Sequence, residues 1–191
     1  MIATELTEPP ETVPATMDDL ALVQHARRDL SAFATLYERH ATQVYRYLLV
    51  RTGNVDDAQD LTSQTFLAAM QGLHSFRGDR PFPAWLLGIA RNKTMDMFRR
   101  RRPALDLDAA GELAAEGDST ESMVGRRLEV EQVARHLQRL SPDRAEALSL
   151  RLFAGLEVKE IAQIMEKNEP AVRMLVFRGL RDLQEQMQED G

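Results

Sequence analysis

Aromatic and arginine side chains alternate within one short stretch of the sequence, residues 76–82, which is FRGDRPF. Aromatic rings and guanidinium planes can stack on unpaired bases, so this pattern favours contact with melted or single-stranded nucleic acid. Arg91 and Asn92 follow on a predicted helix, which ends in a run of arginines at 99–102 suited to backbone phosphates. The alternative is a solvated helix end, where arginines are favourable because they complement the negative end of the helix dipole.

A second set of residues, near the C-terminus, has the spacing of a helix-turn-helix. A short helix over 158–165, a turn at 166–168 and a longer helix opening at Pro170 follow one another. Side chains in the first turns of such a second helix reach base edges in the major groove, where arginine can form two hydrogen bonds to guanine. Arg173 and Arg178 lie on the outward face, so the pattern predicts a helix that contacts duplex DNA. An ordinary helical hairpin with solvated arginines is the alternative.

The chain offers no comparable set of residues for catalysis or for metal binding. It has no cysteine, and its histidines are scattered without a ligand-spaced partner. Nothing marks a combination of nucleophile, base and acid. Asp57, Asp60 and Gln64 share one exposed helix stripe, which solvation and the favourable interaction of acids with a helix N-terminus can explain. The sequence therefore predicts a non-enzymatic protein without a metal or other cofactor.

Charge is unevenly distributed along the 191 residues, although the net charge is only −6. Residues 76–102 are strongly basic, whereas residues 1–17 and 103–125 are acidic. Salt screens charges beyond roughly 10 Å, so the local basic block matters more for nucleic-acid binding than the total does. The composition is globular, and no apolar run approaches the roughly 18 residues of a membrane span. The N-terminus lacks the basic residues of a secretory signal, so we expect a cytoplasmic protein without membrane insertion.

Helical periodicity predicts the elements that must position these residues. Apolar residues recur three to four apart from Leu20 onward, and no segment shows the alternation of a strand. Gly53 and Asn54 end one helix, and Asp56 can cap the next. The expected fold is all-α, with two small helical domains joined by a flexible acidic linker. The expected boundaries are a disordered acidic tail over 1–17, a helical bundle over 18–102, the linker over 103–125 and a second helical domain over 126–188.

Taken together and in this order, the segments resemble the extracytoplasmic-function (ECF, group 4) sigma factors of bacterial RNA polymerase, which belong to the sigma-70 family. FATLYERH at 33–40 is similar to the family's opening segment. VDDAQDLTSQTF at 55–66 is similar to its acidic helix. FRG at 76–78, with the helix that follows it, resembles the promoter-melting segment of sigma region 2.

The C-terminal segments are similar to sigma region 4 of the same family. LSP at 140–142 and FRGL at 177–180 mark the two ends of the similar stretch, with the helix-turn-helix between them. The resemblance covers residues 18–102 and 128–187, which is nearly everything except the tail and the linker. It therefore implies a sigma region 2 helical bundle and a sigma region 4 helix-turn-helix.

The resemblance implies a sigma factor that binds core RNA polymerase and directs promoter recognition and melting. It implies that core polymerase is bound through the beta-prime clamp helices, with the beta subunit as a further partner. The residues implied for this contact are Asp57, Asp60, Leu61 and Gln64. Those implied for the minus-ten promoter element are Phe76, Arg77, Asp79, Arg80, Phe82, Arg91, Asn92, Arg99 and Arg100. Those implied for the minus-thirty-five element are Asn168, Glu169, Arg173, Met174, Phe177 and Arg178. An anti-sigma factor that holds the protein inactive is implied as a further partner.

Two departures from the family pattern have consequences. Glu166 stands in the helix-turn-helix turn where glycine is usual, so it must adopt a positive φ or another turn geometry. Met174, Leu175 and Val176 replace a more polar pair, so the family does not predict the minus-thirty-five sequence. In the family the loop here spanning 75–82 holds a base extruded from the duplex, and its contacts must offset an unstacking cost of a few kcal/mol.

Two other functions compete with the sigma-factor hypothesis. A free-standing operator-binding regulator would bind duplex DNA alone, usually as a dimer on a palindrome, whereas a sigma factor would need core polymerase. The acidic helix and the FRG loop argue against the regulator, because a sensor domain needs neither. A small helical enzyme acting on nucleic acid would show turnover or a metal requirement, and no residues mark either.

Overall fold

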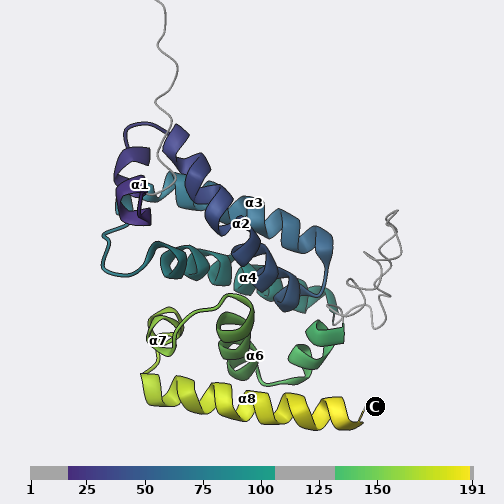
Figure 1. Ribbon diagram of the computed structural model, residues 1–191. Helices are drawn as coiled ribbons and strands as arrows, with labels where there is room; N and C mark the ends of the chain where they lie inside the picture. The colour runs from purple at the N-terminus through teal and green to yellow at the C-terminus, as the bar shows by residue number, and fades with distance from the viewer. Residues whose placement is uncertain (1–16, 106–131, 190–191) are drawn as a thin grey trace, which may run out of the picture.

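The computed structural model describes residues 17–105 and 132–189, and every regular element in these two ranges is helical (Figure 1). The N-terminal half, residues 17–105, has α1 (Asp19–Ala26), α2 (Ser31–Thr52), α3 (Val55–Gln71), the short 3-10 helix η1 (Leu73–Ser75) and α4 (Phe82–Leu105). The C-terminal half, residues 132–189, has a helix over 132–139, α6 (Pro142–Leu148), a π-helical turn η2 (Ser149–Phe153), α7 (Val158–Met165) and α8 (Glu169–Glu189). The predicted all-α class is confirmed for the described residues.

The junction between α2 and α3 differs by one detail from the prediction. Gly53 ends α2 with φ 66°, a conformation that glycine adopts without strain. The cap of α3 is Asn54, whose side chain accepts a hydrogen bond from the Asp57 amide at 2.9 Å. The predicted cap, Asp56, lies within the first turn instead. A capping side chain must reach the amide two or three positions further on, and Asn54 stands where this is possible.

The boundary expected at residue 102 falls inside a helix. Helix α4 continues through Pro103 to Leu105, so the first residues of the expected linker are helical. Pro83 near its start is favourable, because the first turn of a helix has no intrahelical partner for its amide groups. Residues 106–125 of the expected linker and residues 1–16 of the expected tail lie outside the described residues, so their predicted flexibility stays a prediction.

The turn between α7 and α8 adopts one of the two geometries left open for Glu166, the one with a positive φ. Glu166 has φ 55° and ψ 41°, and within the described residues it is the non-glycine residue with positive φ. The Lys167 amide closes the turn by donating to the Ala162 carbonyl at 3.0 Å. At the other end of α7, the amide of Glu157 donates to the Glu160 carboxylate at 2.7 Å, which satisfies one backbone group at the helix start.

The two halves share one hydrophobic core. Leu36, Leu48 and Leu86 of the N-terminal half belong to the same buried cluster as Leu150 and Ile161 of the C-terminal half. In Figure 1, α6 and α7 lie between α4 on one side and α8 on the other. The two expected helical domains are therefore present, but they pack directly against each other. Local periodicity cannot predict this packing, because it identifies an apolar face and not the partner that covers it.

Candidate nucleic-acid and partner surfaces

The acidic stripe predicted on α3 lines a groove between α3 and α4. Asp57, Asp60, Leu61 and Gln64 form one wall, and residues of the basic half of α4 form the other, namely Lys93, Asp96, Met97, Arg100 and Arg101. Asp60 and Gln64 are exposed, whereas Leu61 is buried and anchors the helix in the core. The structure thus brings the four predicted core-polymerase-binding residues together on one helix.

Asp57 differs from its neighbours because both of its carboxylate oxygens are already occupied. Arg101 donates one hydrogen bond to each of them at 2.8 Å, in a two-pronged pair that ties α4 to α3. This bond raises the pKa of the Arg101 guanidinium. The Gln64 amide in turn donates to Asp60 at 2.7 Å. The Gln64 amide is uncharged, so it leaves the negative charge of Asp60 uncompensated, whereas the Arg101 guanidinium neutralises that of Asp57. Asp60 is therefore the more available carboxylate of the two, and Asp57 holds α3 and α4 together.

The two aromatic residues of the 76–82 stretch do not lie on the surface. Phe76 and Phe82 are 3% and 2% exposed, and their ring centroids are 5.7 Å apart in an edge-to-face arrangement. Trp85 packs against both, with centroids at 5.2 Å and 5.7 Å. The aromatic residues of this stretch suggested base stacking, whereas in this structure Phe82 belongs to the core. Stacking of a base on either phenylalanine therefore requires the loop to move.

The charged residues of that stretch lie at or near the surface, as do Gly78 and Pro81. Arg77 and Asp79 are exposed, and Arg80 is half-buried and lies 3.7 Å from the Asp79 carboxylate. The loop and the start of α1 enclose a hollow of about 480 Å³ whose lining includes Leu20, Gly78 and Phe82. The sequence analysis missed the contribution of α1. Leu20 is apolar yet 46% exposed, and the arrangement that places it against this loop is tertiary.

The predicted minus-ten residues of α4 face different surroundings. Asn92, Arg99 and Arg100 are exposed, and Arg99 pairs with Asp96 at 2.8 Å. Arg91 instead points towards the C-terminal half, with its Nε atom 3.8 Å from the Glu146 carboxylate. The structure therefore separates Arg91 from the other α4 residues of this set.

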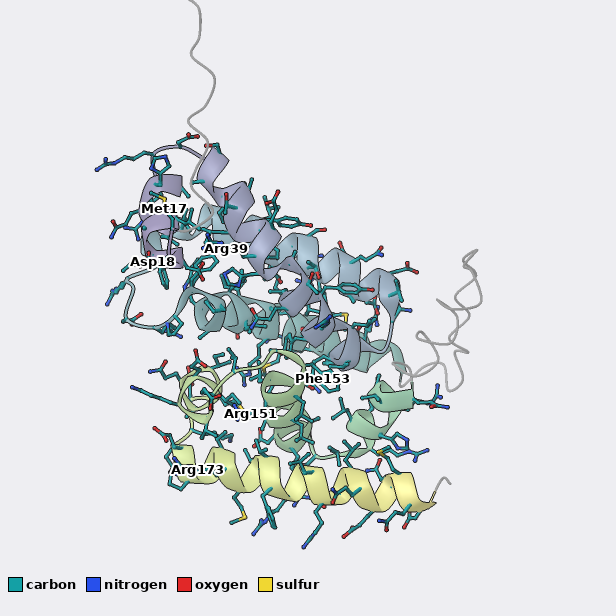
Figure 2. All side chains as sticks on the ribbon, viewed as in Figure 1. Met17, Asp18, Arg39, Arg151, Phe153 and Arg173 are labelled. Carbon is teal, nitrogen blue, oxygen red and sulfur yellow. The ribbon has the colours of Figure 1, made fainter. Side chains whose placement is uncertain are left out.

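The predicted recognition face of α8 lies open to solvent. Arg173, Met174, Phe177 and Arg178 are exposed, and Phe177 reaches 64% exposure. Figure 2 shows Arg173 at the end of α8 that lies near α7. The opposite side of the helix packs on α6, where Gly179 allows a close approach.

Two residues of the predicted minus-thirty-five set have structural partners. Asn168 caps α8, since its side chain accepts a hydrogen bond from the Ala171 amide at 2.8 Å. Glu169 pairs with Arg173 at 2.7 Å one turn further along and so restrains the direction of that guanidinium.

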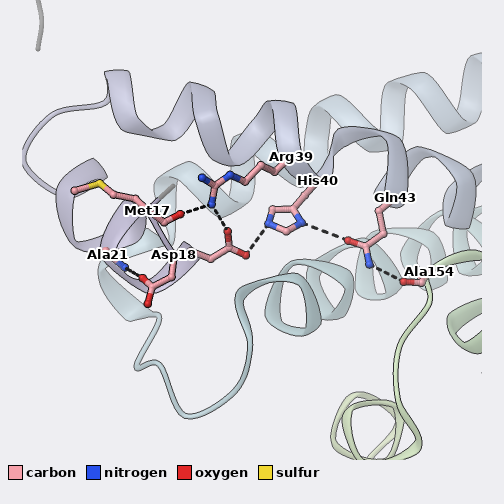
Figure 3. Close-up of polar contacts among 8 residues, drawn as sticks. Met17, Asp18, Ala21, Arg39, His40, Gln43 and Ala154 are labelled. Atoms are coloured by element: carbon pink, nitrogen blue, oxygen red, sulfur yellow. Dashed lines mark hydrogen bonds and ion pairs between the residues drawn. The ribbon is translucent and has the colours of Figure 1, made fainter. Parts of the chain in front are cut away.

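A chain of polar contacts crosses the N-terminal half and ends on the C-terminal half (Figure 3). Asp19 accepts from Arg39 at 3.1 Å and contacts the His40 ring at 2.8 Å. The other ring nitrogen of His40 lies 3.4 Å from Gln43, and Gln43 donates to the Ala154 carbonyl at 2.6 Å. The start of α1, beside the loop hollow, is thereby connected to the turn after η2.

Neither a metal site nor a membrane span is found in the described part of the chain. Residues 17–105 and 132–189 contain no group of three or more histidine, aspartate or glutamate side chains that could hold a metal ion. None of the helices in those ranges is long and apolar enough to cross a membrane.

Comparison with known proteins identifies the family to which this fold belongs. Residues 36–104 match the family profile for Sigma-70 region 2, and residues 131–183 match that for Sigma-70 region 4. The ECF RNA polymerase sigma factor BldN of Streptomyces coelicolor is 36% identical over 93% of this chain and 70% of its own length. The RNA polymerase sigma factor CnrH of Cupriavidus metallidurans is 30% identical over 86% of this chain and 91% of its own. The chain belongs to the sigma-70 family, and within it to the ECF sigma factors.

Solved structures show the same fold. CnrH in complex with the cytosolic domain of CnrY has a TM-score of 0.72 and 28% identity, over 93% of this chain and 100% of that one. The sigma factor RpoE in complex with the anti-sigma factor NepR, from Bartonella quintana, has a TM-score of 0.65 at 22% identity, over 83% and 98% of the two chains. The expectation of a sigma region 2 bundle followed by a region 4 helix-turn-helix is confirmed.

Proposed function

We propose that this ECF sigma factor binds core RNA polymerase through α3 and contacts the two promoter elements through α4 with its preceding loop and through α8. The observation that supports this assignment most directly is the open face of α8, where arginines flank exposed apolar side chains on the second helix of a helix-turn-helix. Such a face has no packing role, and its chemistry matches the major groove. The protein acts as a specificity subunit without a catalytic site of its own, in the cytoplasm.

The α3 stripe is the proposed contact with the beta-prime clamp helices. Asp60 and Gln64 are exposed and lie one helical turn apart, with Leu61 anchoring the helix between them. Asp57 shapes the groove through Arg101. An exposed carboxylate at the edge of a packed surface favours a basic partner, and like charge opposite it costs several kcal/mol.

The minus-ten element is proposed to contact the 76–82 loop and the exposed side of α4. Arg77 and Arg80 on the loop, with Asn92, Arg99 and Arg100 on α4, supply phosphate and base contacts. The hollow beside the loop is lined by apolar residues, among them Leu20 and Pro83, together with charged residues of α1 and the loop, and such a mixed lining suits an extruded base. Phe76 and Phe82 line this hollow but are themselves buried. A base can therefore stack on either ring only after the loop has moved.

The minus-thirty-five element is proposed to contact α8. Arg173 and Arg178 can form paired hydrogen bonds to guanine, and Met174 and Phe177 can contact thymine methyl groups. Asn168 and Glu169 position the helix start and Arg173. Replacing thymine by uracil in the bound duplex removes only the methyl group, so it tests the apolar contact without changing any hydrogen bond.

An anti-sigma factor is the proposed regulator. The solved structure of CnrH, a relative that the present chain covers almost completely, contains the cytosolic domain of CnrY. We infer that a comparable partner engages this protein. Affinity purification of the full-length chain from its native lysate tests this, since recovery only as free monomer or only with polymerase contradicts it.

Run-off transcription is the experiment that tests the proposed function. The purified protein and bacterial core polymerase are mixed with a fragmented library of the host's DNA, with core polymerase alone as the control. Discrete transcripts that require both proteins support the proposal, and their start sites identify the promoters. Duplex binding by the protein alone, without such transcripts, favours an operator-binding regulator and overturns the proposal.

A further inference from the structure

The first helix, α1, contacts the segment that joins α3 to α4 through an arginine side chain. Arg27, at the C-terminal end of α1, donates from both Nε and Nη2 to the Leu73 carbonyl at 3.3 Å. The same Nη2 atom also donates to the Phe76 carbonyl. One guanidinium of α1 therefore holds two backbone groups at the point where the chain leaves η1 and enters the 76–82 loop.

The chemistry of arginine suits this contact with two carbonyls. The guanidinium carries its N–H donors in a fixed plane, whereas the lysine ammonium is a point charge on a flexible stem. A charged donor also forms a stronger hydrogen bond to a carbonyl than a neutral donor does. The contact therefore depends on the geometry of the Arg27 side chain as well as on its charge.

Helix α1 is itself anchored, so Arg27 is a fixed point against which the loop is held. The buried side chains of α1 are Leu22, Val23 and Ala26. At the start of the helix, the Asp19 carboxylate lies 3.1 Å from the Arg39 guanidinium and 2.8 Å from the His40 ring, both on α2 (Figure 3). Packing in the middle and polar contacts at the start thus restrain α1 on α2.

A second contact between α1 and the loop lies near the middle of the loop. Gly78 has φ 73°, which glycine adopts without strain, and a Cβ atom added there would lie 3.1 Å from Leu20 Cδ1. Leu20 and Arg27 are seven positions apart, which places them on the same face of a helix. Helix α1 therefore presents one face to the loop, with an apolar contact at one end and a charged contact at the other.

Arg27 restrains the part of the loop that borders the hollow. The Phe76 carbonyl and the Arg77 amide belong to one planar peptide group, so holding the carbonyl fixes the direction in which the chain continues to Arg77. Phe76, Gly78 and Leu20 all line the hollow of about 480 Å³. The shape of this hollow therefore depends on where Arg27 holds the entry of the loop.

We propose that Arg27 is a positioning residue for the minus-ten element, which holds the entry of the 76–82 loop against α1 so that the hollow can accept an unpaired base. Arg27 acts here through the loop backbone and not by contact with DNA. A loop that is already ordered does not have to be ordered when the base binds, which favours binding. The inference rests on the proposed function for the role of the loop, whereas the contacts of Arg27 with the two carbonyls do not.

Arg27→Met in the full-length protein is the variant that tests this role. Methionine is also long and unbranched but has no donor for the carbonyls. Arg28→Met is the matched control, because Arg28 is the next residue, is exposed and loses the same charge. Arg27→Lys is the conservative variant, since it keeps the charge without the planar set of donors.

Hydrogen exchange of the free protein tests the contact itself. The amides of Ser75 and Phe76 donate to the carbonyls of Gly72 and Leu73, so their exchange reports opening of the loop entry. Arg27→Met is expected to speed this exchange about tenfold, because hydrogen bonds from a charged group are lost. Arg28→Met is expected to match the unmodified protein. Unchanged exchange in Arg27→Met overturns the proposal.

Strand opening and core binding, measured separately, test the role in promoter use. The probe is a promoter duplex identified by run-off transcription, bound by the protein with core polymerase. Permanganate oxidation of unpaired thymines reports opening, and fluorescence anisotropy with labelled protein reports core binding. Arg27→Met is expected to lower opening at least about tenfold and to leave core binding unchanged. Arg28→Met is expected to change neither quantity, and Arg27→Lys to open the promoter to an intermediate extent.

Two results of these measurements overturn the positioning role. An equal loss of core binding in Arg27→Met shows that Arg27 supports the helical bundle as a whole. Full opening by Arg27→Lys shows that the charge alone suffices and that the paired contact with the carbonyls is not required.

Salt dependence separates a positioning residue from a residue that binds phosphate. Each phosphate contact that is lost lowers the slope of log binding constant against log salt concentration by about 0.7–0.9. Arg27→Met is expected to weaken promoter binding by the holoenzyme without changing this slope. A slope that falls by one such step shows direct contact with DNA and overturns the proposal. If the unmodified protein supports no transcription, the proposed function fails instead, and hydrogen exchange still decides whether Arg27 holds the loop.

Discussion

Two arginines that the family resemblance implies for promoter DNA occupy opposite situations in the two halves of the molecule. Arg173 on α8 is exposed and restrained by Glu169 of its own helix, whereas Arg91 on α4 faces a buried glutamate of the other half. The same contrast holds for the aromatic residues, since Phe177 is exposed and Phe76 and Phe82 are buried. Under the proposed function, the C-terminal surface can contact duplex DNA as it stands, whereas Arg91, Phe76 and Phe82 of the N-terminal half are not exposed. An exposed helix face is enough to contact an intact DNA duplex. Stacking of an unpaired base on Phe76 or Phe82 additionally requires that these buried rings become accessible.

The largest effect is expected where the N-terminal half is already exposed. Asp60→Arg places a positive charge on the proposed polymerase contact and is expected to weaken core binding at least about 100-fold, because like charges at an interface cost several kcal/mol. Fluorescence anisotropy with labelled protein and core polymerase measures this. Glu185→Arg makes the same charge change on the C-terminal part of α8 and is the control. Normal binding by Asp60→Arg contradicts the assignment of α3.

The open face of α8 predicts the next largest effect. Arg178→Ala is expected to reduce promoter-dependent transcription about 5- to 150-fold, the range that corresponds to about 1–3 kcal/mol for one base contact. Core binding is expected to stay unchanged. Arg135→Ala, an exposed arginine on the 132–139 helix, is the control. A comparable loss of core binding in Arg178→Ala shows that α8 does not act mainly on DNA.

Gly179 in the C-terminal half and Gly88 in the N-terminal half differ in how closely other atoms pack around them. A Cβ atom at Gly179 lies 2.9 Å from Leu148 Cδ1, whereas one at Gly88 in α4 has nothing within 4 Å. Gly179→Ala is therefore expected to destabilise the protein by about 1–2 kcal/mol through overpacking. Gly88→Ala is expected to stabilise it by about 0.5–1 kcal/mol through helix propensity. Urea unfolding measures both, and changes of the same sign in the two variants contradict the close α6–α8 approach.

A further small effect is expected at the contact between the halves, where the buried Tyr47 hydroxyl of α2 donates to the Glu146 carboxylate of α6 at 2.7 Å. Tyr47→Phe removes one hydrogen bond to Glu146 and is expected to lower the unfolding free energy by about 0.5–1.5 kcal/mol near neutral pH. Burial and the negative charge of Glu146 raise the pKa of the Tyr47 hydroxyl, so its contribution is complete below its ordinary pKa of about 10 and falls as the pH rises towards its folded value.

Unfolding measured at several pH values gives the test of this contact. The difference between the unmodified protein and Tyr47→Phe is expected to shrink above about pH 10. Tyr37→Phe, which alters an exposed hydroxyl, is the control. A difference that does not change with pH contradicts the buried Tyr47–Glu146 contact.

The sequence predicted the features that depend on local periodicity. The all-α class, the helix-turn-helix and the outward direction of Arg173 and Arg178 follow from apolar residues spaced along one face of a helix. At Glu166 the missing glycine of the family pattern left two turn geometries open, and the structure shows the one with positive φ. These features depend on residues within a few positions of one another, so the sequence contains the necessary information.

The features that the sequence did not predict depend on distant partners. A glutamate is typical of the solvent-exposed face of a helix, so nothing near Glu146 in the sequence predicts its burial, and its partner Tyr47 is 99 positions away. Phe82 is an aromatic residue next to arginines, a pattern typical of base stacking, but its ring is buried against Phe76 and Trp85. The cap of α3 was misplaced within the same turn because Asn54 and Asp56 are both good capping residues, and only the backbone geometry distinguishes them.

The shared core has a consequence for the order in which the protein is synthesised. The apolar surface of the N-terminal half is complete by Leu105, but the residues that cover it, including Leu150 and Leu156, follow about 50 residues later. At translation rates of about 5–20 residues per second, this leaves a delay of roughly 3–10 s. During that delay the nascent chain presents α3, α4 and Arg91 without the C-terminal half. A ribosome-bound sigma factor is therefore briefly more open than the finished one.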